Sequence, residues 1–368
     1  MAAKVKMGLI GVGNISPAYI KGSRAFENLD LVAVSDIDVE RAKARAAEFN
    51  IAKACSVDEL LADPEIEIVV NLTVPQSHAA VNMQIINAGK NAYAEKPFGL
   101  SREEGKPVLD AAAAKKLLVG CAPDTFLGGG IQTCRKLIDE GAIGEPIAAV
   151  AYMVGHGPES WHPNPTFYYA RGGGPMFDMG PYYLTALINL LGPVKRVTAS
   201  ARASFPERTA TSKELNGLKI PVEIPTHIAG VMDFESGAIG NLIMSFDVWS
   251  HSLPRIEIYG SEGSLNVPDP NTFGGPVKIR KAADKDWQDV TLTHGYTENM
   301  RGIGVADMAY ALRSGRANRA SGALAYHVLD LMQSFHEASE QGKHIMIGST
   351  VAKPAPLPVG LKPGTLDE

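Results

Sequence analysis

A glycine-rich turn near the start of the chain and a lysine in a later turn are the first residues whose types and spacing indicate chemistry. The turn, residues 11–16 with the sequence G-V-G-N-I-S, directly follows a short apolar run that predicts a buried strand. Its glycines, Gly11 and Gly13, allow the backbone to turn tightly and to approach a pyrophosphate at a helix amino terminus. Ser16 stands where a third glycine is usual, a position that mainly governs how closely helix and strand pack. With the tripeptide Glu95-Lys96-Pro97, the turn predicts a bound dinucleotide with a lysine beside it.

An acidic residue at the end of the second predicted strand, residues 31–36, bears on the choice of dinucleotide. Asp36 follows Gly13 at close to the roughly 20 positions expected for the carboxylate that holds the adenosine ribose. A carboxylate there accepts hydrogen bonds from the ribose hydroxyls and repels a 2′-phosphate, so NAD is the predicted cofactor and NADP is less favoured. Arg41 on the next helix could offset that repulsion. The alternating charges of residues 38–43 also fit a solvated helix face.

The first third of the sequence alternates between predicted strands and helices. Strands are expected over residues 66–72 and 91–94, with a helix over 78–88 between them. Such alternation predicts an α/β unit with a doubly wound parallel sheet, whose ligands bind at the carboxyl ends of its strands. Asp36, residues 73–78 and the pair Glu95-Lys96 all fall at those ends.

The middle of the chain has a different pattern, with few helices between its strands. Strands are predicted over residues 147–154, 194–204, 227–234, 238–246, 255–259 and 263–267. Strands that follow one another through turns favour a large, mostly antiparallel sheet in an α+β domain, one face of which could cover the cofactor or pack on a partner subunit. The predicted division is a nucleotide-binding domain over residues 1–122, a substrate-binding and oligomerisation domain over 123–352, and an extended carboxyl-terminal tail over 353–368.

Composition excludes several classes of protein. The chain has 368 residues, 45% of them hydrophobic and 20% charged, which is typical of a soluble protein with two domains. A formal net charge of −5 provides no basic surface for nucleic acid. No apolar run is long enough to span a membrane, and no secretion signal opens the chain, so a cytoplasmic location is expected. Three cysteines, Cys55, Cys121 and Cys134, lack paired metal-ligand spacing, and no metal site is predicted.

One further segment completes a set of motifs that occur in a known order. Residues 172–180 read G-G-G-P-M-F-D-M-G, and they follow the glycine turn, Asp36, the segment Thr73-Val74-Pro75 with His78, and the E-K-P tripeptide. With these motifs the chain resembles the glucose-fructose oxidoreductase/inositol dehydrogenase (Gfo/Idh/MocA) family over nearly its full length. The resemblance implies a Rossmann domain followed by a domain with a large open sheet. It also implies NAD(P)-dependent oxidation or reduction of sugars and polyols, by dimers or tetramers.

The resemblance also implies three catalytic residues. Members of the family place the lysine of E-K-P and the aspartate and histidine of D-x-G-x-H around the reacting carbon, and Lys96 and Asp178 match the first two. Tyr182 replaces the histidine, as in the branches that resemble glucose-fructose oxidoreductase and dihydrodiol dehydrogenase. A phenol with an ordinary pKa of about 10 is a weaker base at neutral pH but a competent proton donor. Two assignments therefore stay open: Lys96 removes the hydroxyl proton, or Tyr182 exchanges it while Lys96 stays charged and stabilises the oxyanion.

The remaining candidates surround these three residues. Glu95 is expected to shape the turn into Pro97, and the resemblance implies a cis bond before that proline. The cofactor is expected to contact Gly11, Gly13, Asn14, Ile15, Asp36, Thr73, Pro75, His78, Glu95 and Lys96. The substrate is expected to contact Lys96, Asp124, His156, Trp161, Arg171, Asp178 and Tyr182.

The function that these observations favour is an NAD-dependent sugar or polyol dehydrogenase. Two alternatives are a glycosidase that oxidises its substrate transiently with NAD, and a sensor that holds NAD without catalysis. Retention of both Lys96 and Asp178 disfavours the sensor.

Overall fold

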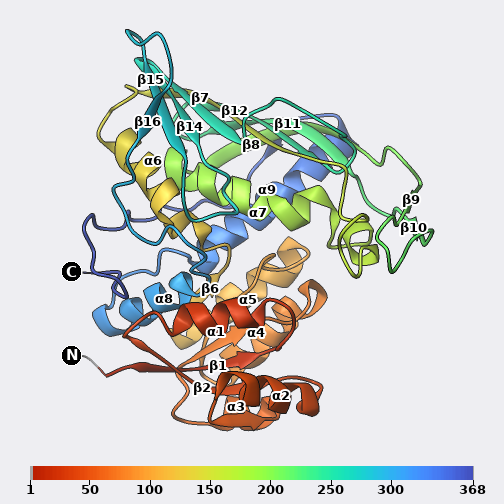
Figure 1. Ribbon diagram of the computed structural model, residues 1–368, viewed down its shortest axis with the longest axis vertical. Helices are drawn as coiled ribbons and strands as arrows, with labels where there is room; N and C mark the ends of the chain where they lie inside the picture. Colours follow the sequence, from red (N-terminus) through yellow and green to blue (C-terminus); the bar gives the residue numbers. More distant parts are fainter. Residues whose placement is uncertain (1–2, 368) are drawn as a thin grey trace.

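The computed structural model describes residues 3–367, which form two stacked units, each built on its own sheet (Figure 1). The strands of the lower unit are β1 (Val5–Ile10), β2 (Leu29–Ser35), β3 (Lys53–Cys55), β4 (Ile68–Asn71), β5 (Asn91–Ala94) and β6 (Val119–Cys121). They pair in parallel in the order β3-β2-β1-β4-β5-β6. This order is that of a doubly wound dinucleotide-binding sheet, and it confirms the predicted Rossmann arrangement.

Helices on both faces bury the strands of this sheet. The helices are α1 (Ser16–Ser23), α2 (Val39–Phe49), α3 (Val57–Ala62), α4 (His78–Asn87) and α5 (Arg102–Lys115), with the short 3-10 turn η1 (Pro75–Ser77) before α4. Every residue of β4 and β5 is buried, as expected where a parallel strand is covered on both sides. Ser56 and Glu59 form a capping box at the start of α3, which the sequence pattern S-x-x-E predicts.

The upper unit contains a nine-stranded, mostly antiparallel sheet. Its strands are β7 (Pro146–Val154), β8 (Val194–Arg202), β11 (His227–Phe234), β12 (Ile239–Ser245), β13 (Ile256–Gly260), β14 (Gly263–Val267), β15 (Val277–Lys281), β16 (Gln288–Val290) and β17 (Ile345–Met346). They lie in the order β16-β15-β14-β13-β7-β12-β11-β8-β17, and only β7 and β12 pair in parallel. Two short strands, β9 (Glu207–Thr209) and β10 (Lys219–Pro221), form a separate ribbon.

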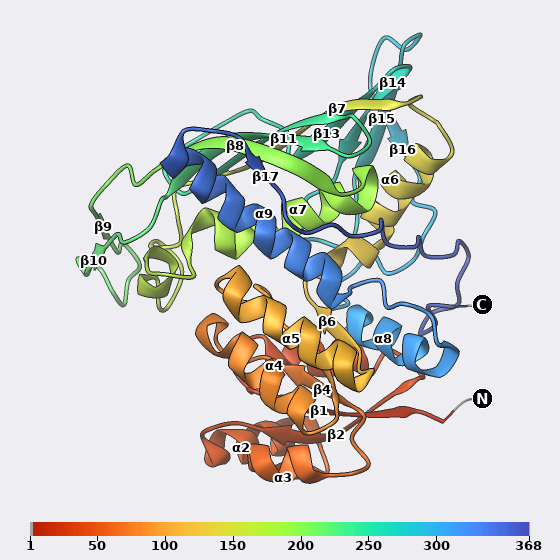
Figure 2. The ribbon, with the colours of Figure 1, turned by 180° about the vertical axis from the view of Figure 1, so that it is seen from behind.

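Three helices, α6 (Gly129–Asp139), α7 (Gly174–Leu191) and α9 (Gly322–Gln341), lie between the upper sheet and the lower unit (Figures 1 and 2). Residues of β11 alternate strictly between buried and half-buried, as expected of a strand with one face on a helical layer. At Gly230 of β11, a Cβ atom would lie 2.6 Å from the ring of Phe335 on α9, so the helix packs directly on the strand there. No helix of residues 3–367 is both long and apolar enough to cross a membrane.

The chain returns to the lower unit after the upper sheet. Helix α8 (Ile303–Ser314) lies beside α1 (Figure 1). Its Ala306 carbonyl accepts a hydrogen bond of 2.9 Å from Asn28, and both guanidinium nitrogens of Arg313 lie 2.7 Å from the Glu67 carboxylate. These contacts join α8 to the Rossmann unit, and the division of the chain at residue 122 stays a prediction.

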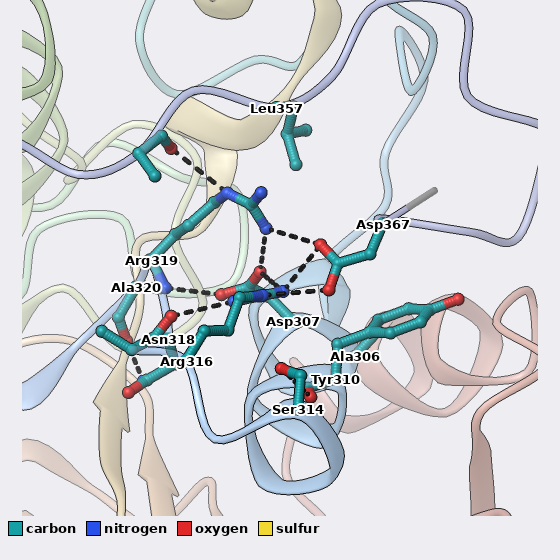
Figure 3. Close-up of polar contacts among 12 residues, drawn as sticks. Ala306, Asp307, Tyr310, Ser314, Arg316, Asn318, Arg319, Ala320, Leu357 and Asp367 are labelled. Carbon is teal, nitrogen blue, oxygen red and sulfur yellow. Dashed lines mark hydrogen bonds and ion pairs between the residues drawn. The ribbon is translucent and has the colours of Figure 1, made fainter. Parts of the chain in front are cut away.

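The carboxyl-terminal segment, residues 353–367, contains no helix or strand, and part of it packs against the rest of the protein. Leu366 is fully buried, and Asp367 pairs with Arg316 at 2.9 Å and with Arg319 at 3.3 Å. Both arginines also bind Asp307 of α8, which is fully buried (Figure 3). The tail therefore fastens α8 in place rather than lying loosely on the surface.

Candidate active site

Lys96 and Asp178, which are 82 positions apart in the sequence, form an ion pair between the two units. Lys96 follows β5, and Asp178 lies in the second turn of α7. The Lys96 Nζ atom donates hydrogen bonds to Asp178 Oδ1 at 2.7 Å and to the Asp178 backbone carbonyl at 2.6 Å. The two side chains are 17% and 22% exposed, so the pair is largely shielded from water. The peptide bond between Lys96 and Pro97 is cis, which confirms that expectation.

The surroundings of Lys96 favour its charged form. Burial by itself lowers the pKa of the ammonium, but the charge of Asp178 and the hydrogen bond to its carboxylate raise this pKa, and the net result is a pKa above the ordinary value. A lysine that removes a proton near neutral pH needs a lowered pKa instead. Of the two open assignments, the geometry of the free protein favours the one in which Lys96 stays charged.

Tyr182 lies one helical turn after Asp178, so both side chains lie on the same face of α7. Its ring centroid is 5.3 Å from Lys96 Nζ, and the side chain is only 7% exposed. Burial raises the pKa of the phenol, while Lys96 and the guanidinium of Arg301 partly oppose this rise. The phenol is therefore neutral at physiological pH and carries a proton that it can donate.

Two residues of this cluster were missed by the sequence analysis. Arg301, directly before the glycine that precedes α8, faces the Tyr182 hydroxyl, and its guanidinium also donates to Asn271 Oδ1 at 3.0 Å. Tyr168, in the 3-10 turn η3 (Thr166–Tyr169), has its pKa raised to about 12 by burial and by the nearby charge of Asp178. The aromatic run T-F-Y-Y, in a segment rich in glycine and proline (residues 155–175), was the available signal for Tyr168, whereas no local motif marks Arg301.

The glycine turn has the form that a bound pyrophosphate requires. Gly11 has a φ of +93°, and a Cβ atom there would lie 2.7 Å from the backbone carbonyl of Leu72. At Gly13 a Cβ atom would meet nothing within 4 Å, so open space lies in front of this residue. Within residues 3–367, the backbone N–H groups of Gly13, Asn14 and Ile15 have no hydrogen-bond acceptor. These free donors at the amino terminus of α1 fit a phosphate group, because the helix end also carries partial positive charge.

Asp36 lies at the carboxyl end of β2, next to the glycine turn. Its Oδ2 atom accepts a hydrogen bond of 2.9 Å from the Val12 N–H group, which fixes the carboxylate against the turn. Arg41 pairs with Oδ1 at 2.6 Å, so this arginine is not simply part of a solvated face. Burial raises the pKa of Asp36, but the Val12 N–H group and Arg41 outweigh it, and the net pKa is lowered. An ionised carboxylate is therefore available where the adenosine ribose is expected.

The loops after β4 and β5 are joined by contacts of His78. One ring nitrogen, Nδ1, lies 2.7 Å from the Pro97 carbonyl oxygen, and Nε2 lies 3.0 Å from that of Thr73. The ring is only 1% exposed, and burial lowers its pKa. His78 thus positions the loops after β4 and β5, including Pro75 at the start of η1. Glu95 accepts hydrogen bonds from the Tyr19 hydroxyl and the Lys96 N–H group, as a residue that shapes the turn should.

The other predicted substrate residues lie apart from the Lys96 cluster. Asp124 is 1% exposed, and its Oδ2 atom accepts from the N–H groups of Gly302 and Gly304, so it caps α8; burial raises its pKa to about 6. Arg171 is 77% exposed and lies 3.7 Å from Glu104.

His156 stacks on Trp249 with ring centroids 3.3 Å apart, and Trp161 is 66% exposed. None of the contacts recorded for these residues within positions 3–367 reaches Lys96, Asp178 or Tyr182.

Comparison with known proteins places this geometry in context. An uncharacterized oxidoreductase of Schizosaccharomyces pombe is 32% identical over 169 residues, which are 45% of either chain. The 1,5-anhydro-D-fructose reductase of Ensifer adhaerens is 26% identical over 286 residues, 75% of this chain and 80% of that protein. Among solved structures, levoglucosan dehydrogenase in complex with NADH and L-sorbose superposes with a TM-score of 0.80 at 21% identity, over 95% of this chain and 100% of that one. At that identity the superposition establishes the fold alone.

Two family profiles account for most of the sequence. Residues 5–122 match the oxidoreductase family with an NAD-binding Rossmann fold, and residues 131–266 match the GFO/IDH/MocA carboxyl-terminal domain. The first match spans the lower sheet, and the second spans the upper sheet from β7 to β14 without β15, β16 and β17; together they contain Lys96, Asp178 and Tyr182. The chain belongs to the Gfo/Idh/MocA family of NAD-binding oxidoreductases.

Proposed function

We propose that this protein is an NAD-dependent dehydrogenase that oxidises a hydroxyl group of a sugar or polyol, or reduces the corresponding carbonyl. The observation that carries the proposal is the cluster of Lys96, Asp178 and Tyr182 at the carboxyl end of β5, on the edge of the sheet where the glycine turn has free N–H groups. The names of the relatives, a reductase and a dehydrogenase of sugar derivatives, support the same substrate class.

NAD, when bound, supplies a nicotinamide ring that accepts or returns a hydride at a carbon atom of the substrate. In the oxidative direction the substrate loses the carbon-bound hydrogen as hydride and the hydroxyl hydrogen as a proton, and a carbonyl forms. Tyr182 exchanges that proton with the substrate oxygen. Lys96 keeps its charge and stabilises the negative charge that develops on the same oxygen. Asp178 orients Lys96 through its carboxylate and its backbone carbonyl.

The neutral phenol of Tyr182 bears on the favoured direction. A phenol whose pKa is raised by burial donates a proton more readily than it accepts one at neutral pH. Reduction of a carbonyl with NADH can therefore use the neutral, protonated form of Tyr182 that the free protein already has. Oxidation with NAD requires Tyr182 to lose its proton first, so it should accelerate with rising pH.

A panel of aldoses, inositols and deoxysugars, assayed with NAD for the absorbance of NADH, tests the proposal. Net accumulation of NADH with at least one sugar or polyol is the expected result, and Lys96→Met should abolish it. A chromogenic aryl glycoside is assayed beside the panel, and release of its phenol without net NADH would support the glycosidase instead. Binding of NADH without turnover of any panel member or of its oxidised form would support the sensor.

A further inference from the structure

The segment between β7 and α7 is a compact aromatic loop beside β9 and β10 (Figure 1), and it is fastened at its base by a buried arginine. Arg208 of β9 is 5% exposed, and its Nε atom donates to Glu159 Oε1 at 2.7 Å. Its Nη1 atom donates to Asp247 Oδ1 at 2.8 Å, and the Tyr169 hydroxyl donates to the other oxygen of Glu159. A buried charge network of this kind persists only when its geometry is well satisfied, so it fixes the loop rather than leaving it mobile.

Trp161 lies two residues after the fixed Glu159 and is 66% exposed. Single exposed apolar side chains are common on protein surfaces, but an exposed indole offers a ligand both a flat apolar face and an N–H donor. The Trp161 ring is therefore free to contact a ligand.

A row of aromatic contacts connects Trp161 with the proposed active site. The Trp161 ring lies 5.4 Å from that of His162, edge to face, and the His162 ring lies 4.9 Å from that of Tyr168. Tyr168 in turn lies near Asp178 and Lys96, whose charges act on its hydroxyl. The row thus extends from Tyr168, which lies near the reacting groups, to the exposed ring of Trp161.

His162 provides a polar group within this row. Its Nδ1 atom accepts a hydrogen bond of 3.0 Å from the Asn164 N–H group, so the proton of the neutral ring is on Nε2. That N–H group and the indole N–H group of Trp161 can donate to hydroxyl oxygens, while the aromatic faces contact C–H groups. Flat apolar faces next to a few hydrogen-bond donors match a pyranose ring, which has C–H groups on its faces and hydroxyl groups on its rim.

We propose that Trp161 and His162 form an outer subsite that binds a second sugar ring, so that the preferred substrate is a disaccharide or other glycoside. This inference rests on the proposed function, because Lys96, Asp178 and Tyr182 would act on the inner ring. Pairs of stacked aromatic rings gain about 0.5–1.5 kcal/mol beyond buried area, and a comparable gain for a sugar ring on Trp161 corresponds to about twofold to tenfold in affinity.

The test compares matched sugars in two assays. D-glucose is compared with cellobiose, and D-xylose with xylobiose, by kcat/KM with NAD and by calorimetric binding to the NADH-bound protein. The disaccharide should be favoured over its monosaccharide by about threefold to tenfold. Trp161→Ala should bring that ratio close to one, and Trp161→Phe should preserve most of it. Trp287→Ala, at a half-exposed tryptophan near β16 on the opposite edge of the sheet, should leave the ratio unchanged.

Two results would overturn the outer subsite: no preference for disaccharides in the unmodified protein, or an equal loss for both sugars in Trp161→Ala. The molar mass of Trp161→Ala, measured by light scattering, is a further test. If the variant dissociates from an oligomer that the unmodified protein forms, Trp161 is a subunit contact and the outer subsite is refuted. The calorimetric arm separates this proposal from the proposed function. If a disaccharide binds in a manner that depends on Trp161 but no NADH forms, the dehydrogenase proposal is refuted and the outer subsite is retained. If NADH forms without a preference for disaccharides, the outer subsite is refuted and the dehydrogenase proposal is retained.

Discussion

Replacement of Asp178 by Asn removes the charge that keeps Lys96 protonated while preserving the shape of the side chain. Breaking a fully buried ion pair costs about 3–5 kcal/mol, and exposed pairs contribute about 1 kcal/mol or less. Because the two side chains are 17% and 22% exposed, an intermediate value of about 3 kcal/mol applies. At about 1.4 kcal/mol per pKa unit, the pKa of Lys96 should fall by roughly two units. Burial lowers this pKa, and Asp178 is the largest of the influences that oppose burial in the unmodified protein.

The assay is the pH dependence of kcat/KM for the best sugar or polyol of the panel. If Lys96 must be charged, activity is lost as the pH rises through its pKa, so Asp178→Asn should move this alkaline decline to lower pH by about two units. If Lys96 were the base, the same change would increase activity at neutral pH, and that result would refute our reasoning. Asp110→Asn, in the exposed pair with Lys106 on α5, is the matched control and should leave the profile unchanged.

Three further substitutions test other parts of the site. Tyr182→Phe should lower kcat by about 10²-fold or more with little change in NADH affinity, since a positioned proton donor contributes about 10²–10⁴-fold, and near-normal turnover would exclude the relay. Gly13→Leu should weaken NADH binding without lowering the melting temperature of the free protein, because the new side chain enters the open space in front of the glycine turn. A lower melting temperature would contradict the prediction that this space is left for the pyrophosphate. NADH should raise the melting temperature of the unmodified protein more than NADPH does, and Asp36→Ala should reduce this difference between the two cofactors. An equal rise with both cofactors in the unmodified protein would instead assign Arg41 to a 2′-phosphate.

The Rossmann unit was predictable from sequence because its signals are local. Strands such as β4 are continuous apolar runs, and the glycine turn has a fixed spacing to Asp36. The upper sheet was predicted in outline for the same reason. Its strands alternate with a period of two, and the hairpin between β11 and β12 turns at Gly237, whose φ is +97°.

Features that depend on distant parts of the chain were not predictable in this way. Helix α8 packs on α1, and Asp124 caps it from a position 178 residues earlier, which no local pattern encodes. Asp124 therefore looked like a free carboxylate at the end of a strand. The anchoring of the tail depends on Asp367 meeting Arg316 and Arg319, and composition alone indicates only an extended segment.

Within the candidate site, helix periodicity predicted that Asp178 and Tyr182 share a face, and the structure places both next to Lys96. The Gly/Pro-rich segment 155–175 offered several aromatic and charged residues without a period to rank them. The structure brings Tyr168 to the cluster and leaves Arg171 in solvent.

Transfer of a labelled hydrogen is the measurement that tests the central claim most directly. A sugar that is active in the panel, deuterated at the carbon that is oxidised, is incubated with NAD, and the nicotinamide ring is then analysed by nuclear magnetic resonance. The account predicts that the unmodified protein transfers the deuterium to the nicotinamide ring, and that Lys96→Met binds NADH normally but transfers it at least about 10²-fold more slowly. Loss of the deuterium to solvent, or transfer by Lys96→Met at the unmodified rate, would contradict it.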